Sequence, residues 1–319
     1  KGFGLFMDAL TQPAFPEEQI KREVEKTLGA IRSAEDDPGE VAEKEFQKTL
    51  FPVSSYGHPA EGTRESLSRL TRETNARFYQ THYHPNNAIL TIVGDLSMDE
   101  LKGKLLSRLA KWPLGKVPQE SFKSAIEKGH KIIKIDRPIT QANIILGHQG
   151  VSRNNPDYYA LTVMNYILGG GGFSSRLVEE IRIKRGLAYS VYSFFDPGKY
   201  PGSFQIVLQT KNASAHEAVS LSLREMKRIQ TEPVLEKELE GAKKYLIGSF
   251  PMRLDTQAKL ANFLSQVEYY ALGRDYPEKY PSLITAVSRQ EVLRVAKTYL
   301  HPKNTILVIV ANLKEEKMD

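Results

Sequence analysis

Cysteine is absent from this chain of 319 residues. Its absence excludes disulfide bonds, thiolate zinc sites and a cysteine nucleophile. The sequence also lacks an apolar run of about eighteen residues, so it predicts no membrane span. Basic residues number 44 and acidic residues 38, an excess of +6 that is spread along the chain. Because no Lys/Arg cluster alternates with aromatic residues, we expect no dedicated nucleic-acid function.

The residues that are present suit a globular protein with a substantial core. Hydrophobic residues make up 40% and charged residues 26% of the sequence, the usual balance of such proteins. The length exceeds that of one ordinary domain and fits two. A chain without cysteine suits either side of a bacterial membrane, so composition does not identify the compartment.

A long stretch of the sequence occurs twice. The sixteen residues from Thr81 to Leu96 match those from Thr298 to Leu313 with nine identities, at an offset of 217. A repeat of this length indicates a duplicated domain, because the units of solenoid proteins span only about 20–50 residues. Further identities at the same offset pair Pro16 with Pro233, Glu23 with Glu240 and Lys26 with Lys243.

Each copy predicts the same local structure. The prolines after His84 and His301 disfavour helix at the histidines, so we expect a helix to end before each pair. The β-branched and leucine residues that follow predict a strand. We interpret the His-Pro-x-Asn turn as the connection between that helix and that strand. The expected strands are Ala88–Val93 and Thr305–Val310, and Glu-rich helices are expected at Pro16–Arg32 and Pro233–Ser249.

The second copy contains enough elements for a complete domain. Its strands follow one another through short turns, and its helices gather in pairs. This order predicts an α+β fold in which a mainly antiparallel sheet packs against helices. Besides the elements above, strands are expected at residues 131–135, 142–147, 188–195 and 203–209, and helices at 156–168, 174–184 and 215–230.

These elements predict two homologous layered αβ domains. Residues 1–110 would form the C-terminal part of the first domain, and residues 129–319 a complete second domain. Residues 111–128 are polar, contain two prolines and read as the linker. Subtracting the offset of 217 from residue 129 places the start of the first domain roughly ninety residues before Lys1. We therefore expect the first domain to be truncated at its N-terminus.

The histidines of this sequence show no metal-binding pattern. None of the seven belongs to His-Glu-x-x-His or His-x-x-Glu-His, which place two imidazoles on one helical face around zinc. His82 and His84 lie two residues apart, a spacing that does not favour a shared helical face. We interpret these two as a surface pair without a common ligand.

Four consecutive glycines, Gly169, Gly170, Gly171 and Gly172, precede Phe-Ser-Ser and an expected helix. The segment lacks the lysine of a phosphate-binding loop and follows a helix, where a nucleotide-binding loop would follow a strand. One interpretation is a helix C-terminus with Ser174 or Ser175 as the next N-cap. Since a cap needs fewer glycines, we also expect the backbone to approach another group closely here.

Arg182 and Tyr189 lie seven residues apart on either side of a predicted tight turn at Gly186. A turn of this kind brings the ends of a helix and a strand together. A guanidinium beside a phenol hydroxyl suits the binding of a peptide carbonyl or a developing oxyanion. The alternative is an exposed arginine and a packed tyrosine without a joint role.

Five segments form a specific set: Asp36-Asp37-Pro38, His58-Pro-Ala-Glu-Gly62, Tyr83-His-Pro-Asn-Asn87 with Val93-Gly-Asp95, Leu168–Leu177, and Arg182-x-x-x-Gly-Leu-Ala-Tyr189. Together they resemble the pitrilysin/insulinase family of inverzincin metallopeptidases, which includes the mitochondrial processing peptidases. The resemblance spans the whole chain. It implies two similar αβ domains that form half of a clamshell.

The resemblance also implies roles for individual residues. Family enzymes hold zinc through His-x-x-Glu-His and a later glutamate, and an Arg/Tyr pair in the opposing domain holds the substrate. Arg182 and Tyr189 match that pair. The zinc-binding glutamate falls on Ala30, whose methyl group binds no metal. Glu23 matches the supporting acid outside the zinc ligands, although it also fits a surface acid of a helix.

The missing ligand implies the zinc-free, substrate-binding subunit of a heteromeric peptidase that hydrolyses unstructured polypeptides. The expected partner is a zinc-bearing homologous subunit, or a second copy in a homo-oligomer, and no cofactor is expected in this chain. Two alternatives stay open. One is an active zinc peptidase whose histidine motif lies upstream of residue 1, and the other is a structural or assembly subunit of the same fold. Exported bacterial relatives favour the periplasm, although the sequence leaves the location open.

Overall fold

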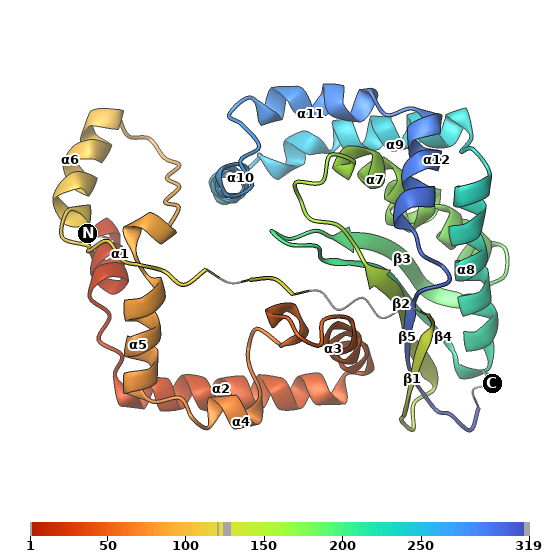
Figure 1. Cartoon of the computed structure of the whole chain (residues 1–319), viewed down its shortest axis with the longest axis horizontal. Coiled ribbons are helices and arrows are strands. Elements are labelled where there is room, and N and C mark those ends of the chain that lie inside the picture. The colour runs from red at the N-terminus through yellow and green to blue at the C-terminus, as the bar shows by residue number, and fades with distance from the viewer. Residues whose placement is uncertain (1, 120, 124–128, 316–319) are drawn as a thin grey trace. The chain divides into compact units, whose positions relative to one another are not determined.

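The computed structural model describes residues 2–119, 121–123 and 129–315 (Figure 1). Close contacts divide the chain into two units, and each unit is built from three segments of the sequence. Unit 1 comprises Lys1–Ala34, Pro59–Ser121 and Arg253–Ala271, and unit 2 comprises Glu35–His58, Phe122–Met252 and Leu272–Asp319. The boundaries predicted at residues 110 and 129 stay a prediction. Residues 120 and 124–128 of the predicted linker lie outside the described residues.

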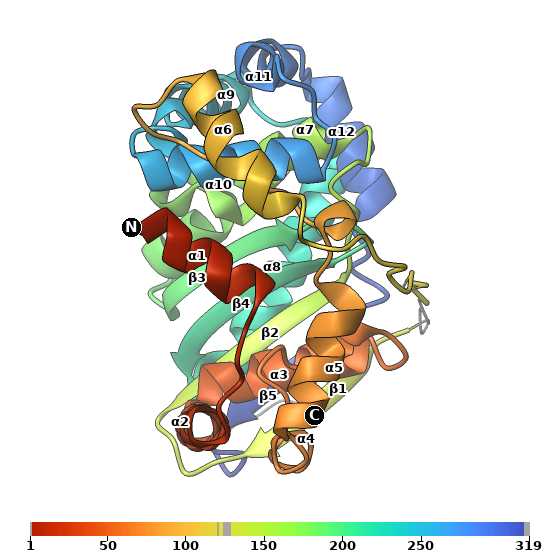
Figure 2. The same cartoon turned by 90° about the vertical axis from the view of Figure 1, so that its left-hand side faces the viewer.

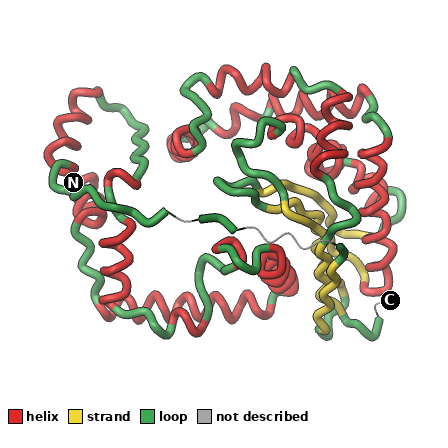
Figure 3. Tube along the Cα trace, viewed as in Figure 1, coloured by secondary structure: helices red, strands yellow, loops and turns green. Residues whose placement is uncertain are grey.

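Unit 2 contains a five-stranded sheet, shown in yellow in Figure 3. The strands lie in the order β1-β5-β2-β4-β3. β1 pairs with β5 in parallel, and every other neighbouring pair is antiparallel. The sequence therefore predicted the mainly antiparallel α+β fold correctly. The strands are β1 Lys131–Asp136, β2 Gln141–Gln149, β3 Ala188–Asp196, β4 Ser203–Lys211 and β5 Ile306–Ala311.

Helix α3, Pro38–Leu50, covers one face of this sheet (Figures 1 and 2). It begins where the Asp37 side chain accepts hydrogen bonds from the N–H groups of Gly39 and Glu40. Phe46 is fully buried against Ile145 and against Val308 and Val310 of β5. Because side chains alternate along a strand, the neighbouring residues of β2 and β5 point to the opposite face, which α8 covers.

The remaining helices of unit 2 pack against one another, and α12 joins them to α8, Ala215–Thr231. Helix α12 contacts both α7 and α8, and α11 contacts α7 and α9. Within the described residues, no helix is long and apolar enough to cross a membrane. The helices are α7 Tyr158–Asn165, α9 Glu236–Gly248, α11 Tyr276–Thr285 and α12 Arg289–Tyr299.

Unit 1 is built from helices in its described residues. Local signals start several of them, since Thr63, Thr71 and Ser97 each form a capping box with the residue three positions on. Distant segments are joined by hydrogen bonds, for example from the Tyr79 hydroxyl to the Leu10 carbonyl at 2.7 Å. The helices are α1 Gly2–Thr11, α2 Glu17–Asp36, α4 Arg64–Leu67, α5 Arg72–His82, α6 Met98–Leu109 and α10 Gln257–Tyr269.

The strand expected at Ala88–Val93 is wrong. These residues contain no strand, whereas their repeat counterpart forms β5. A strand is stabilised by hydrogen bonds to its neighbours, and β5 has β1 on one side and β2 on the other. Within the described residues, residues 88–93 have no such neighbours. The same sequence pattern therefore forms a strand only in unit 2.

Candidate functional site

The glycine-rich segment follows α7 as a π-helical turn, Tyr166–Gly170. The N–H group of Gly171 bonds to the carbonyl of Tyr166 at 2.9 Å, five residues back. A Cβ at Gly169 would lie 2.5 Å from the Ser193 hydroxyl of β3, so any larger residue would push the turn away from the sheet. The close backbone approach expected from the sequence is thus an approach to this chain's own strand.

The end of the segment exposes an aromatic ring. Gly172 adopts a positive φ of 56°, a conformation that favours glycine. Phe173 follows with 70% of its surface exposed. The Ser175 hydroxyl donates to the Gly172 carbonyl at 2.6 Å and closes the loop. Ser175 lies directly before helical residues 176 and 177, has an extended backbone, and its carbonyl accepts the N–H group of Glu179 at 3.0 Å, so it occupies the expected N-cap position. Its hydroxyl, however, bonds back to the loop and does not accept a bond from the helix.

Arg182 lies on a second π-helical turn, Val178–Ile183. The sequence predicted an ordinary helix over residues 174–184, but the N–H group of Lys184 bonds to the carbonyl of Glu179, again five residues back. The turn that follows is as expected, since Gly186 adopts a positive φ of 62°. π-helical turns recur at functional sites of proteins, and here two of them flank one loop.

Tyr189 occupies a β-bulge at the start of β3. Ala188 lies opposite Thr210 and Ser190 lies opposite Gln209, so Tyr189 is an extra residue without a partner on β4. A bulge changes the direction of the side chain that it carries. The Tyr189 side chain is 74% exposed, although it lies on a strand of the core sheet.

These local features bring three side chains together. The guanidinium carbon of Arg182 lies 4.9 Å from the centre of the Phe173 ring and 5.7 Å from that of Tyr189. Both distances are typical of cation–π contacts. The structure thus places Arg182 and Tyr189 side by side, as the spacing suggested, and adds Phe173. We call these three residues the arginine–aromatic cluster; their role as a binding site stays a prediction.

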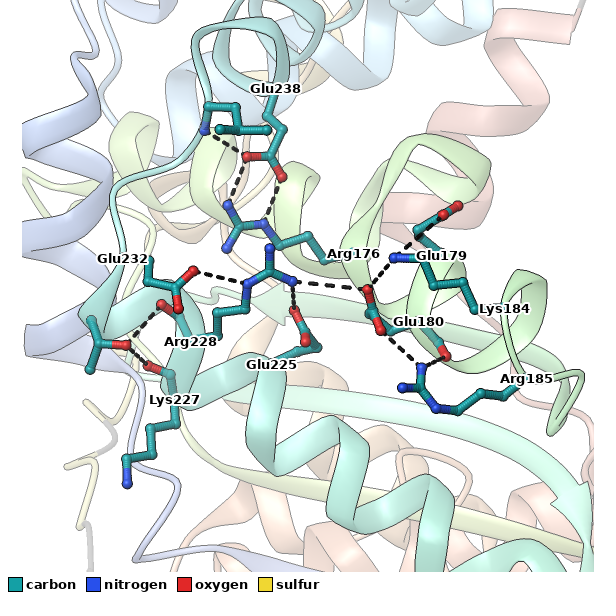
Figure 4. A network of polar contacts seen from close by, with 12 residues as sticks. Arg176, Glu179, Glu180, Lys184, Arg185, Glu225, Lys227, Arg228, Glu232 and Glu238 are labelled. Atoms are coloured by element: carbon teal, nitrogen blue, oxygen red, sulfur yellow. Dashed lines mark hydrogen bonds and ion pairs between the residues drawn. The ribbon is translucent and has the colours of Figure 1, made fainter.

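A largely buried ion pair ties the segment before Arg182 to helix α9 (Figure 4). Arg176 is 7% exposed and bonds to both carboxylate oxygens of Glu238 on α9, at 2.6 and 2.7 Å. Burial alone would raise the pKa of Glu238, but the bonds from Arg176 and from the Leu235 N–H group outweigh it and lower that pKa. A bidentate pair of this kind fixes the orientation of both partners.

The acids near Arg182 are engaged by other cations. Glu180 accepts bonds from Lys184 at 2.6 Å and Arg185 at 2.9 Å, and these bonds lower its pKa. Glu225 pairs with Arg228 at 3.2 Å, and burial raises its pKa. Within the described residues, no carboxylate forms an ion pair with Arg182. The described part of the chain therefore supplies no carboxylate partner for its charge.

The residues that the sequence analysis considered in connection with metal binding have other surroundings in the structure. Ala30 lies on α2 and offers only a methyl group. Glu23 is exposed on the same helix and pairs with Lys26 at 3.4 Å. The ring of His84 contacts the Pro113 carbonyl at 3.1 Å. In the part of the chain that the structure describes, no three His, Asp or Glu side chains converge to hold a metal ion.

Comparison with known proteins identifies the family. The profile of the peptidase M16 inactive domain matches residues 69–246, more than half of the chain. The chain belongs to the peptidase M16 family. The match confirms the resemblance carried by the five sequence segments, and the domain that it describes is the inactive one.

Individual relatives agree with this assignment. An uncharacterized zinc protease of Streptomyces coelicolor is 28% identical over 95% of this chain and 67% of its own length. The non-peptidase homolog YmxG of Helicobacter pylori is 27% identical over 97% of this chain and 72% of its own. The crystal structure of a peptidase M16 inactive domain from Pseudomonas fluorescens matches with a TM-score of 0.92 at 28% identity, over 99% of this chain and 76% of that one.

Sequence reasoning missed Phe173 and both π-helical turns. The four glycines were the available signal, because such a run requires close packing that an ordinary cap does not. Nothing in the local sequence shows that the Phe173 ring reaches Arg182, nine residues later. That contact depends on the widened turns, which place the loop beside the bulge at Tyr189.

Proposed function

We propose that this chain is a non-catalytic, substrate-binding subunit of a heteromeric zinc peptidase that cleaves unstructured polypeptides. The observation that carries the proposal is the un-neutralised guanidinium of Arg182 between two exposed rings. Guanidinium and phenol groups donate hydrogen bonds to peptide carbonyl groups. The residue at the expected zinc position, Ala30, supports a role without metal chemistry, and zinc would be supplied by the partner subunit.

The sheet offers a second element for polypeptide binding. β3 is the last strand of the sheet and carries Tyr189 at its start. An edge strand presents N–H and C=O groups to which an extended polypeptide can add as a further strand. A bound chain in that position would pass the arginine–aromatic cluster. An extended segment of an unstructured polypeptide has free backbone groups that can pair with an edge in this way.

Binding of a fluorescent, flexible peptide to the purified chain tests the proposal. We expect Arg182→Ala to weaken binding at least tenfold and Tyr189→Phe to weaken it less, because Phe retains the ring. Arg274→Ala, at an exposed arginine of unit 2, is the matched control and should bind as the wild type does. In a reconstituted complex with a zinc-bearing homologous subunit, Arg182→Ala should also reduce peptide turnover.

Metal analysis separates this proposal from an active peptidase. The name of the Streptomyces coelicolor relative includes zinc protease, so this alternative deserves a direct test. We expect the full-length chain alone to bind no stoichiometric zinc and to cleave no peptide. Zinc binding with cleavage by the chain alone would contradict the proposal. Turnover that is insensitive to Arg182→Ala would instead indicate a structural subunit.

A further inference from the structure

Arg182 differs from several basic residues of the same unit in having no carboxylate partner among the described residues. Arg176, Lys184, Arg185 and Arg228 lie in the same network, and each pairs with a glutamate (Figure 4). Glu180 is held by two of these cations, and Glu225 and Glu238 are largely buried. The glutamates of the network are therefore not available to Arg182. Its positive charge is left for a group outside the described chain.

The rings beside Arg182 leave its hydrogen-bond donors usable. A guanidinium presents five N–H donors in its own plane, and a cation–π contact uses the face of an aromatic ring. Arg182 can therefore keep its contacts to Phe173 and Tyr189 while it donates two parallel bonds. This fork matches the two oxygens of a carboxylate better than the single oxygen of a carbonyl group.

Phe173 adds an exposed apolar surface. A phenylalanine ring gains nothing from contact with water. Its ring has no polar group, and 70% of the residue is accessible. Single exposed apolar residues are common, but this ring lies beside an un-neutralised cation and a second exposed ring. A ligand with an apolar side chain next to its anionic group would cover the ring and neutralise the cation together.

We propose that the arginine–aromatic cluster binds a peptide carboxylate that has an apolar or aromatic side chain beside it. Arg182 pairs with the carboxylate, the Tyr189 hydroxyl donates a further bond, and Phe173 contacts the side chain and determines specificity. The inference rests on the proposed function and names its substrate class. The carboxylate comes either from the C-terminus of the polypeptide or from an acidic side chain.

Four versions of one flexible, labelled peptide distinguish these sources. The first ends in Phe with a free carboxylate, and the second ends in Phe amide. The third ends in an amide but carries an internal Glu-Phe pair, and the fourth ends in Ser with a free carboxylate. Dissociation constants are measured for the wild-type chain and for Arg182→Ala and Phe173→Ala.

We expect the Phe amide to bind about tenfold more weakly than the free acid, because a charge-assisted hydrogen bond is about twice as strong as a neutral one. Replacing the terminal Phe by Ser should weaken binding about fivefold. Phe173→Ala should remove the preference for Phe over Ser, and Arg182→Ala should remove the preference for the acid over the amide. If the Glu-Phe peptide binds as the free acid does, side-chain carboxylates are accepted.

The matched control is Phe78→Ala on α5, since Phe78 is also an exposed phenylalanine, at 59%. It should leave both preferences unchanged. Equal binding of all four peptides, together with weaker binding by Arg182→Ala, would overturn this inference and leave the proposed function standing. Equal binding of all four by Arg182→Ala and the wild type would overturn both.

Discussion

The two copies of the repeat differ in one respect and agree in another. In both, the N–H group of the asparagine bonds to the carbonyl of the histidine at 2.9 Å, from Asn87 to His84 and from Asn304 to His301. The turn is therefore the same in both units. After the turn the copies diverge, because Ile306–Ala311 forms β5 and the equivalent residues 89–94 form no strand.

The side chains of the two copies also differ in how deeply they are buried. Leu307 is 5% exposed and its counterpart Leu90 is 41% exposed, while Ile309 is fully buried and its counterpart Ile92 only half-buried. Residues Leu90–Val93 line an apolar groove of about 500 Å³ within unit 1. A turn needs only its own four residues, but a strand needs partners from elsewhere in the chain. The comparison thus separates local from non-local causes of structure.

The largest expected difference in stability between the copies is at Ile309 and its counterpart Ile92. Ile309→Ala should lower the free energy of unfolding by about 3 kcal/mol, because it empties a fully buried site. Ile92→Ala should cost about 1 kcal/mol or less, since Ile92 is partly exposed. Urea unfolding followed by circular dichroism measures the first. Fluorescence of Trp112, the one tryptophan of the sequence and part of unit 1, follows the second. Equal losses would refute the comparison.

Low pH should reduce the folding stability of unit 2, which contains the second copy, because of His148. Its ring accepts the His301 N–H group at 3.1 Å and contacts the Gln149 carbonyl at 2.8 Å, and burial lowers its pKa to about 4. The unfolded chain takes up this proton near pH 6.5, before the folded chain does. Stability therefore falls as the pH drops from about 6.5 towards 4, by about 2 kcal/mol at pH 5.

The variant His148→Gln tests this cause, because its amide oxygen can still accept the bond from His301. Unfolding midpoints at pH 7 and pH 5 should differ less for the variant than for the wild type. Other titrating groups are common to both proteins and cancel in that difference. The same pH dependence in both proteins would show that His148 is not responsible.

The asparagines of the two turns, Asn87 and Asn304, should contribute similarly to the free energy of unfolding. The Asn304 side chain accepts the Gly129 N–H group at 3.0 Å, and the Asn87 side chain donates to the His82 carbonyl at 3.0 Å. Each bond is solvent-exposed, so Asn304→Ala and Asn87→Ala should each cost about 1 kcal/mol or less. Chemical denaturation measures both. A loss that is several times larger in one copy would show that the turns are not equivalent.

The smallest expected effect concerns an ion pair that occurs in both copies. Lys26 and Glu23 are 3.4 Å apart, and Lys243 and Glu240 are 3.5 Å apart. Both pairs link residues three positions apart on a helix surface, so Glu23→Gln and Glu240→Gln should each change stability by at most about 0.5 kcal/mol. Melting temperatures of the two variants should stay within about 2 °C of the wild type. A clear loss only for Glu23→Gln would indicate a further role for that acid.

Much of unit 2 was predictable because its elements carry strong local patterns. The strand expected at residues 131–135 is β1, Lys131–Asp136, and the helix expected at 215–230 is α8, Ala215–Thr231. The π-helical turns were not predicted, because the wider hydrogen bonds of Gly171 and Lys184 depend on packing in the folded chain and no single residue type marks them in the sequence. The strand at residues 88–93 was wrong because pattern alone does not supply its neighbours.

The candidate site was partly predictable. The spacing of Arg182 and Tyr189 around Gly186 indicated that they could converge, and the structure places them together. The pairing of the acids of unit 2 with other cations could not be predicted, since Glu238 lies 56 positions after Arg182. Figure 4 shows that Glu180, Glu225 and Glu238 each pair with a cation other than Arg182.

The sequence by itself determined the internal repeat, the turns after His84 and His301, the caps of several helices and the presence of a methyl group at Ala30. These features depend on a few consecutive residues or on the identity of one side chain. Only the tertiary structure decided which repeat copy became a strand and which arginines pair with a carboxylate. Both outcomes depend on groups far away in the sequence, because strand pairing and charge neutralisation require partners that only folding brings within a few ångströms.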